Sequence, residues 1–456
     1  MTLDAVLARI DDTLPEATDR LLELLRIPSV STDPAYAEAC GKAAEWLAGD
    51  LRALGFTASV RPTPGHPMVV ARAEGPGKHI LFYGHYDVQP VDPLNLWDRD
   101  PFDPQVEDTP RGKVIRGRGS CDDKGQLMTF IEACRAWKAV HGSLPGNLTI
   151  FLEGEEESGS PSLVPFMQAN AAELGADLAL ICDTGLFAGK PAIVTMLRGL
   201  AGDEVTITGP SKDLHSGMYG GLAMNPLRVL TRILGAMFDD RGRITIPGFY
   251  DDVRELPDAI RAQWQGLGFD HAAFLAEVGL GIPAGEHDRT PLEMLWSRPT
   301  AEINGLWGGY QGAGSKTVIP SQAHAKLTFR LVPGMDPDKV QTQFREWVRA
   351  QVPGDCTVSF SPKAGSPAAE MAIDDPAFEA ARAALTEEWG APAAFVGCGG
   401  SIPIAGHFKT VLGMDALLIG FGRDDDQIHS PNEKYDLECF HKGMRSWARV
   451  LERIAR

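Results

Sequence analysis

Cysteine is scarce in this chain and forms no recognisable pattern. The 456 residues include seven cysteines, and no two of them make a CxxC pair. Their odd number and wide spacing argue against a disulfide framework and against a structural zinc cluster. We therefore expect a protein of a reducing compartment. The cysteines are Cys40, Cys121, Cys134, Cys182, Cys356, Cys398 and Cys439.

Positive charge and long apolar runs are also lacking. Lys and Arg number 43 against 61 Asp and Glu, which gives a formal net charge of −18. This balance argues against a nucleic-acid partner and against an anionic membrane surface. The sequence has no run of about 18 apolar residues, and residues 1–6 carry no basic segment leading into an apolar one. We expect a cytoplasmic protein with no membrane partner.

The chain does contain an alternation of apolar strands and helices. A length of 456 residues suggests two domains. Continuous apolar strands between helices predict an α/β fold with a mainly parallel sheet flanked by helices. The expected strands include 79–83, 147–152, 177–181 and the apolar segment 416–421, with helices up to about residue 27 and at 35–54, 125–140 and 437–454.

The pattern changes near residue 198. Strands at 204–208, 323–332 and 357–360 and helices at 225–238 and 336–350 predict an inserted α+β domain, with a long irregular stretch up to about residue 300. The expected domains are 1–198 and 366–456, which form one catalytic domain, and 199–365, which is the insertion.

Polar residues follow three of the expected strands. His85 and Asp87 come after the first, the run Glu155-Glu156-Glu157 after the second, and Asp183 after the third. Because ligands collect beyond the carboxyl ends of parallel strands, these side chains are expected to meet. Imidazoles together with several carboxylates form the ligand set that a pair of divalent metals needs.

Each segment by itself has a simpler interpretation. His85 and Asp87 suit a polar loop at a strand end, and Asp122 or Asp123 suits a helix cap. The Glu run suits a surface loop, and His215 and His429 suit solvent-exposed or core positions. A phosphate-binding GxxxxGKS or GxxxxGKT loop is absent, which argues against nucleotide binding.

Taken together, the segments Gly84–Pro90, Gly119–Gly125, Glu153–Gly159 and Ile428–Glu433 resemble the dinuclear-zinc metallopeptidases. That family includes carnosine dipeptidases, aminoacylase, succinyl-diaminopimelate desuccinylase and glutamate carboxypeptidase, and the resemblance is closest to the dipeptidase branch. It implies that His85 and Asp183 bind one metal, that Glu157 and His429 bind the other, and that Asp122 bridges them. It also implies a cis peptide between Asp122 and Asp123.

The resemblance assigns further roles. Asp87 orients His85, and Glu156 is the general base. His215 is lent by the insertion of one subunit to the site of its partner, so that residues 199–365 form a lid and dimerisation domain of a homodimer. Arg330 is the arginine that pairs with the substrate's free carboxylate, and the loop with Gly400 and Ser401 holds the substrate's C-terminal end.

The expected function is hydrolysis of the amide bond of a dipeptide or small peptide through a metal-bridging hydroxide. The two metals are expected to be Zn²⁺, with Mn²⁺ or Co²⁺ as alternatives. An N-acyl amino acid deacylase or desuccinylase, or a catalytically silent dimeric binding module, stays open. Dipeptidase relatives commonly have Arg-Glu before Gly-Gly-Ser-Ile-Pro, whereas this chain has Gly397-Cys398 there. We expect Cys398 to be packed rather than to act as a pocket thiol.

Overall fold

The computed structural model describes residues 2–400 and 402–455, which form two compact units. The first comprises Met1–Thr195, Met371–Val396 and His407–Arg456, and the second comprises Met196–Glu370 and Gly397–Gly406. The assignment of a catalytic role to 1–198 and 366–456, and of a lid and dimerisation role to 199–365, stays a prediction. None of the helices in the described residues is long and apolar enough to cross a membrane.

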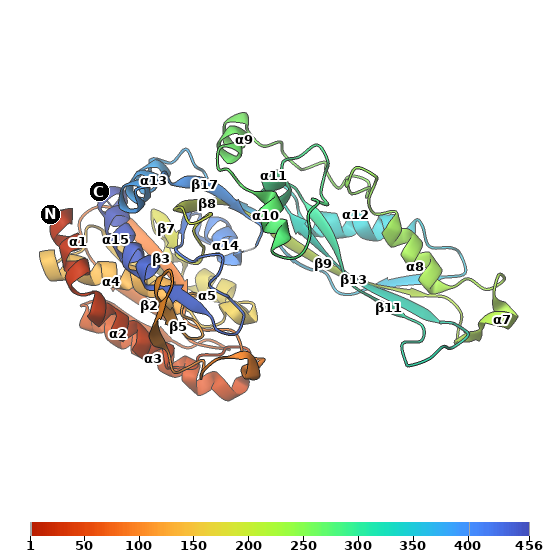
Figure 1. Ribbon diagram of the computed structural model, residues 1–456, viewed down its shortest axis with the longest axis horizontal. Coiled ribbons are helices and arrows are strands. Elements are labelled where there is room, and N and C mark those ends of the chain that lie inside the picture. Colours follow the sequence, from red (N-terminus) through yellow and green to blue (C-terminus); the bar gives the residue numbers. More distant parts are fainter. Residues whose placement is uncertain (1, 401, 456) are drawn as a thin grey trace. The chain divides into compact units, whose positions relative to one another are not determined.

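A large sheet forms the centre of the first unit (Figure 1). Its strands lie in the order β1-β2-β6-β3-β7-β18-β8-β16, with β16 (Ala369–Glu370) paired antiparallel to β8. The four central strands β6, β3, β7 and β18 are parallel, whereas β1, β2 and β8 run antiparallel to their neighbours. The strands are β1 (Thr57–Arg61), β2 (Met68–Ala73), β3 (His79–His85), β6 (Asn147–Glu153), β7 (Leu178–Ile181), β8 (Ala192–Leu197), β17 (Ala394–Cys398), which pairs with β8, and β18 (Ala416–Ile419).

Side chains alternate between the two faces of the sheet along each strand. Since the central strands are mostly apolar, both faces are apolar and both are covered by helices. Phe82 of β3 stacks on Phe130 of α4, with ring centroids 3.9 Å apart, and meets Trp447 of α15 edge-on. The next residue, Tyr83, meets Phe408 of α14. The predicted α/β class is confirmed. The helices are α1 (Leu3–Asp12), α2 (Leu14–Leu25), α3 (Ala37–Ala53), α4 (Lys124–His141), α5 (Leu163–Ala169), α6 (Ala171–Leu174), α13 (Pro376–Trp389), α14 (Pro403–Leu412) and α15 (Leu437–Ile454).

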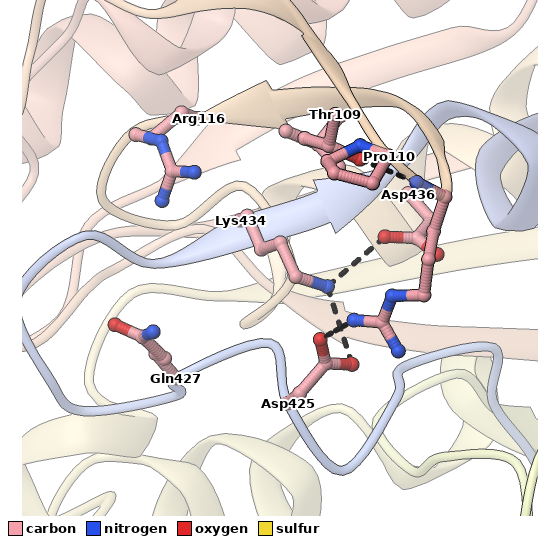
Figure 2. A pocket seen from close by; sticks show the side chains of 9 residues that line it. Thr109, Pro110, Arg116, Asp425, Gln427, Lys434 and Asp436 are labelled. Atoms are coloured by element: carbon pink, nitrogen blue, oxygen red, sulfur yellow. Dashed lines mark hydrogen bonds and ion pairs between the residues drawn. The ribbon is translucent and has the colours of Figure 1, made fainter.

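A small antiparallel sheet, β19-β5-β4, was not predicted. Its strands are β4 (Gln105–Thr109), β5 (Gly112–Arg116) and β19 (Lys434–Asp436), which are short and charged and therefore lack the apolar signal of the central strands. A pocket of about 290 Å³ lies at this sheet, with Lys434 and Arg116 among its lining residues (Figure 2).

The second unit is built on an antiparallel sheet in the order β11-β13-β9-β14, with β15 also paired to β9. Buried and half-buried residues alternate along β9, so that one face is apolar, and helices α8 and α12 pack on the sheet. Strand β11 was missed by the prediction because it is an edge strand in which only Ala301 is buried, so the apolar alternation of a half-buried strand is absent. The bounds are β9 (Gly199–Thr208), β10 (Leu214–His215), β11 (Thr300–Gly308), β12 (Val318–Ile319), β13 (Gln322–Leu331), β14 (Thr357–Phe360), β15 (Ala364–Ser366), β16 (Ala369–Glu370), α7 (Ser216–Tyr219), α8 (Pro226–Gly235) and α12 (Pro337–Arg349).

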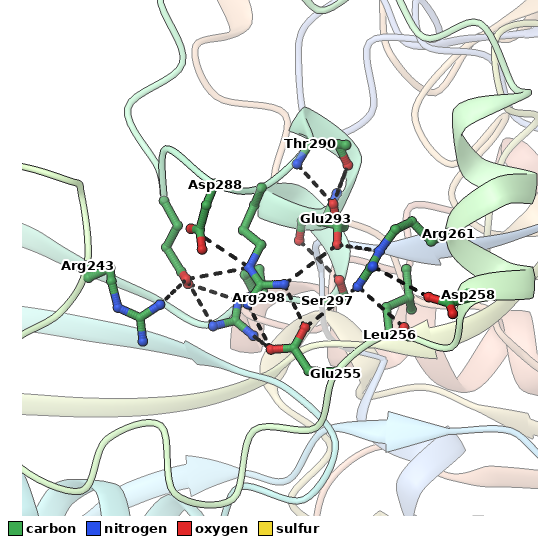
Figure 3. A network of polar contacts seen from close by, with 12 residues as sticks. Arg243, Glu255, Leu256, Asp258, Arg261, Asp288, Thr290, Glu293, Ser297 and Arg298 are labelled. Carbon is green, nitrogen blue, oxygen red and sulfur yellow. Dashed lines mark hydrogen bonds and ion pairs between the residues drawn. The ribbon is translucent and has the colours of Figure 1, made fainter.

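The stretch before residue 300, predicted to be irregular, contains three short helices. These are α9 (Asp258–Gln265), α10 (His271–Ala276) and α11 (Pro291–Trp296). A network of ion pairs holds the segment together, including a bidentate pair of Arg298 with Glu286 at 2.9 Å and a pair of Arg289 with Glu255 at 2.6 Å (Figure 3). Because ion pairs hold this segment together, its short helices carry no long periodic apolar pattern. The sequence therefore contains no signal for them, and the prediction of an irregular stretch was wrong here.

Candidate metal centre

Five side chains converge in the first unit as two overlapping groups of metal-ligand type. His85, Asp122 and Asp183 form one group, and Asp122, Glu157 and His429 form the other. Within each group the donor atoms lie within 4.8 Å of one another. Asp122 is the member that the two groups share.

The sheet explains why these residues meet. His85 ends β3, Glu157 lies in the turn after β6, and Asp183 follows β7 by two residues. Because β6, β3 and β7 are adjacent and parallel, their carboxyl ends deliver the three side chains to one edge. Asp122 precedes α4, and His429 comes from the segment between β18 and β19.

Asp122 faces a different histidine with each of its oxygens. Its Oδ1 lies 3.1 Å from Nε2 of His85, and its Oδ2 lies 2.9 Å from Nε2 of His429. Nε2 of His429 also lies 3.3 Å from Oε2 of Glu157. The peptide between Asp122 and Asp123 is cis, as predicted. Asp123 points elsewhere and accepts the backbone N–H of His85 at 3.1 Å.

Asp87 contacts His85 and the Glu run at the same time. One of its oxygens lies 3.4 Å from Nδ1 of His85. Its carboxylate also accepts the backbone N–H groups of Glu156 at 3.2 Å and of Glu157 at 3.0 Å. Nδ1 of His85 also lies 3.1 Å from the backbone carbonyl of Asp87, so the ring contacts Asp87 through its main chain as well as through its fully buried carboxylate.

Burial and crowding of like charges perturb the titration of the cluster. Burial raises the pKa of Glu156 to about 7; His85 partly offsets this effect, and the charges of Glu157 and Asp122 add to it. Burial also raises the pKa of Asp183 well above its usual range, and Asp122 adds to that rise. Although burial alone would raise it, hydrogen bonds from His429 and His85 lower the pKa of Asp122.

The donor set fits divalent cations. Two imidazoles and three carboxylates are oxygen and nitrogen ligands of the kind that zinc, manganese and cobalt accept. Oε1 of Glu157 is buried without a hydrogen-bond partner among the described residues, so this acceptor has room for a cation. Buried carboxylates this close together need a compensating positive charge.

Sequence reasoning missed two residues that support the ligands. Gln89 donates from Nε2 to Oε2 of Glu157 at 2.7 Å. Glu433 is fully buried, and its carboxylate accepts the backbone N–H of Asp122 at 3.0 Å. Both lie within the segments that carry ligands, Gln89 four residues after His85 and Glu433 four residues after His429, and this proximity was the available signal.

The remaining predicted site residues belong to the second unit or to an undescribed position. His215 is exposed at the end of β10, and its Nδ1 accepts the N–H of Gly217 at 3.0 Å. Arg330 of β13 lines a cavity of about 780 Å³ within that unit, together with Arg198. The carbonyl of Gly400 accepts the N–H of Arg198 at 3.2 Å. Ser401 lies outside the described residues, and the roles of all these residues stay predictions.

The departure at Gly397-Cys398 has a steric reason. A Cβ on Gly397 would come within 2.4 Å of Cβ of Trp296, so a large side chain such as arginine does not fit there unless Trp296 moves. Cys398 is half-buried, and its Sγ accepts the N–H of Gly400 at 3.3 Å.

Comparison with known proteins shows strong similarity over almost the whole chain. The sequence profile of Peptidase family M20/M25/M40 matches residues 81–453. Cys-Gly metallodipeptidase DUG1 of Saccharomyces cerevisiae is 32% identical, covering 99% of this chain and 98% of the relative. The human Beta-Ala-His dipeptidase is 31% identical over 82% of this chain and 75% of its own length.

Solved structures agree with the sequence matches. The structure of the di-peptidase Dug1p from Saccharomyces cerevisiae superposes with a TM-score of 0.80 at 31% identity, covering 99% of this chain and 98% of that one. The crystal structure of human carnosine dipeptidase 1 superposes with a TM-score of 0.77 at 28% identity and covers all of both chains.

Proposed function

This chain belongs to Peptidase family M20/M25/M40 and is a metal-dependent hydrolase of dipeptides, and we propose that it cleaves them with Glu156 as the general base beside a centre of two cations. The observation that carries this proposal is the shared position of Asp122 between two groups of ligands. Glu156 lies in the same turn as the ligand Glu157.

The five converging side chains would hold the metals. His85 and Asp183 would serve one cation, Glu157 and His429 would serve the other, and Asp122, which belongs to both groups, would contribute to both. Bound cations would lower the pKa of a water molecule toward about 7 and polarise the substrate carbonyl. Asp87 keeps the ring of His85 oriented through Nδ1.

Glu156 moves the proton. Its carboxylate takes a proton from the attacking water and delivers it to the leaving amine. A general base works best with a pKa near the working pH, and burial places the pKa of Glu156 at about 7 before any cation is bound. The N–H bond to Asp87 holds its backbone in place.

The second unit would bind the substrate's ends. Arg330 pairs with the free carboxylate, which a planar guanidinium can hold in a bidentate manner. Gly400 and Ser401 contribute the loop at the substrate's C-terminal end. His215, from the partner's second unit, stabilises the developing oxyanion.

We further propose a cytoplasmic homodimer with two Zn²⁺ ions, or Mn²⁺ or Co²⁺ in their place. The second unit supports dimerisation because its edge strand β11 exposes Ile303 and Leu306, and the α7 region exposes Met218 and Leu222. All seven cysteines are free thiols, which supports a reducing compartment.

The change Glu156→Gln tests the mechanism. We expect two cations and the fold to be retained, while the rate falls at least about 10²-fold, because the glutamine amide cannot accept the proton. Glu155→Gln is the matched control. Its carboxylate accepts N–H groups of His66 and Ser162 instead, so this variant should keep most of the activity.

The assay should use purified protein of defined metal content with a panel of dipeptides and N-acyl amino acids. Wild-type activity in Glu156→Gln would reject Glu156 as the base. Activity on N-acyl amino acids alone would indicate a deacylase, and failure on every amide would indicate a silent binding module.

A further inference from the structure

The segment that carries His429 lies in no helix or strand. It runs from the end of β18 to the start of β19. Gln427, His429 and Asn432 all have left-handed backbone conformations, with φ between 56° and 64°, which residues other than glycine rarely adopt. The His429 side chain is itself about half exposed. Regular structure therefore does not fix this ligand, and the neighbouring contacts must do so.

Glu433, four residues after His429, ties this segment to the one that carries Asp122. Its Oε1 accepts the backbone N–H groups of Cys121 at 2.9 Å and Asp122 at 3.0 Å. Its Oε2 accepts the N–H of Gly119 at 2.9 Å and Nη1 of Arg118 at 2.8 Å. The carboxylate is fully buried, and every one of its four donors comes from residues 118–122.

A second carboxylate, Asp426, reinforces the tie from the other side of His429. Its Oδ2 accepts the thiol of Cys121 at 3.3 Å, and its Oδ1 accepts Nζ of Lys434 at 2.6 Å. Lys434 also contacts Asp425 and Asp436, as Figure 2 shows. The segment is thus anchored at both ends, at Asp426 and at Glu433–Lys434, with His429 between the anchors.

We infer that Glu433 is a positioning residue of the metal centre: it sets the place of His429 relative to Asp122 and thereby the affinity for the cations. This inference rests on the proposed function. Asp122 has to present one oxygen to each histidine, so a small shift between the two segments spoils the ligand geometry on the His429 side. A carboxylate that accepts three backbone N–H groups prevents such a shift, because any movement of the segment breaks several charge-assisted hydrogen bonds together.

A purely structural role would have a different signature. Glu132 offers the matched case, since it is a buried carboxylate of the same unit that pairs with Arg20 and Arg135, and it lies outside the ligand groups. Glu132→Gln and Glu433→Gln both remove one buried negative charge from an arginine. If Glu433 only stabilised the fold, the two variants would show the same change in their affinity for Zn²⁺.

The test measures metal affinity separately from stability. Full-length wild type, Glu433→Gln and Glu132→Gln are stripped with a chelator, their melting temperatures are recorded, and Zn²⁺ is titrated by calorimetry. We expect at least one of the two Zn²⁺ sites to weaken about 10–100-fold in Glu433→Gln, and both to stay at wild-type affinity in Glu132→Gln. The visible spectrum of the Co²⁺-loaded protein should change only in Glu433→Gln.

Several outcomes would overturn the inference or the function beneath it. Wild-type affinity for both cations in Glu433→Gln, or equal losses in both variants, rejects the positioning role and leaves the proposed function standing. A wild type that binds none of Zn²⁺, Mn²⁺ and Co²⁺ rejects the proposed centre of two cations itself. If Glu433→Gln does not fold, Glu433→Asp takes its place: the shorter carboxylate cannot reach all four donors, so at least a tenfold loss of affinity is expected, and unchanged affinity there also rejects the role.

Discussion

At the scale of single residues, Asp87 shows how one carboxylate serves two chain segments. The sequence predicts that it orients His85 through the second ring nitrogen, and the distance of 3.4 Å to Nδ1 is compatible with that role. Its bonds to the N–H groups of Glu156 and Glu157 were not predicted, because they join residues about 70 positions apart. The buried carboxylate of Asp87 therefore contacts both His85 and the turn that carries Glu156 and Glu157.

Glu153, at the end of β6, should make stability depend on pH. Burial, partly offset by a hydrogen bond from Tyr83, raises the pKa of this carboxyl to about 8 from its ordinary value of 4.5. The folded protein therefore keeps a proton that the unfolded chain has lost. The resulting stabilisation is full below pH 4.5 and declines by up to about 1.4 kcal/mol per pH unit until it is lost near pH 8.

Glu153→Gln removes this titration and keeps an acceptor for Tyr83. In metal-free protein, we expect the melting temperature of the wild type to fall more between pH 5.5 and 8 than that of the variant. Scanning calorimetry at matched ionic strength measures the difference. Parallel curves for the two proteins would contradict the assigned titration.

At the scale of elements, the effect of a glycine on the stability of the protein depends on whether it lies inside a helix or at its end. Gly41 lies inside α3, where an added Cβ would meet nothing within 4 Å. Gly142 ends α4 in a left-handed conformation with φ of 71° and equally open surroundings. Space is available at both sites, so only the backbone conformation distinguishes them.

Alanine at these two positions should shift stability in opposite directions. Gly41→Ala is expected to stabilise the protein by about 0.5–1 kcal/mol, because alanine loses less conformational entropy in a helix. Gly142→Ala is expected to destabilise it by about 1 kcal/mol, because a Cβ is strained in the left-handed region. Thermal unfolding of the two variants beside wild type measures both, and a shift of the same sign in both would contradict this account.

At the scale of the whole molecule, the proposed dimer makes a prediction that a monomer cannot meet. Glu156→Gln and His215→Ala should each be nearly inactive. In a mixed dimer of the two, one site combines an intact Glu156 with the partner's intact His215. Isolated mixed dimers should therefore show about half of the wild-type rate, since one of their two sites is working.

The control pairs Glu156→Gln with a double variant that carries both changes. No site in that mixture has an intact Glu156, so it should stay inactive. Lack of recovery in the first mixture, with dimers present, would show that His215 does not act across subunits. The measurement is dipeptide hydrolysis after co-expression with two affinity tags, so that mixed dimers are isolated.

The sequence by itself determined the central strands, most of the long helices and the chemical nature of the metal centre. Strand β3 and helix α15 were predictable because apolar pattern and breaking residues are local signals. The placement of His85, Glu157 and Asp183 after strands was likewise local, and parallel pairing of those strands then required them to meet.

The local pattern did not distinguish the members of each acidic pair or run; the family resemblance pointed to Asp122 and Glu157, and the tertiary structure shows the contacts that set them apart. Asp122 meets both histidines while Asp123 turns to the backbone of His85, and Glu157 meets His429 while Glu155 binds His66 and Ser162. The tertiary structure also brought Glu433 to Asp122, with a bond that spans 311 positions. Edge strand β11 escaped prediction because it buries only one side chain, and the stretch around Arg298 escaped it because ion pairs hold that stretch together and leave no periodic apolar pattern.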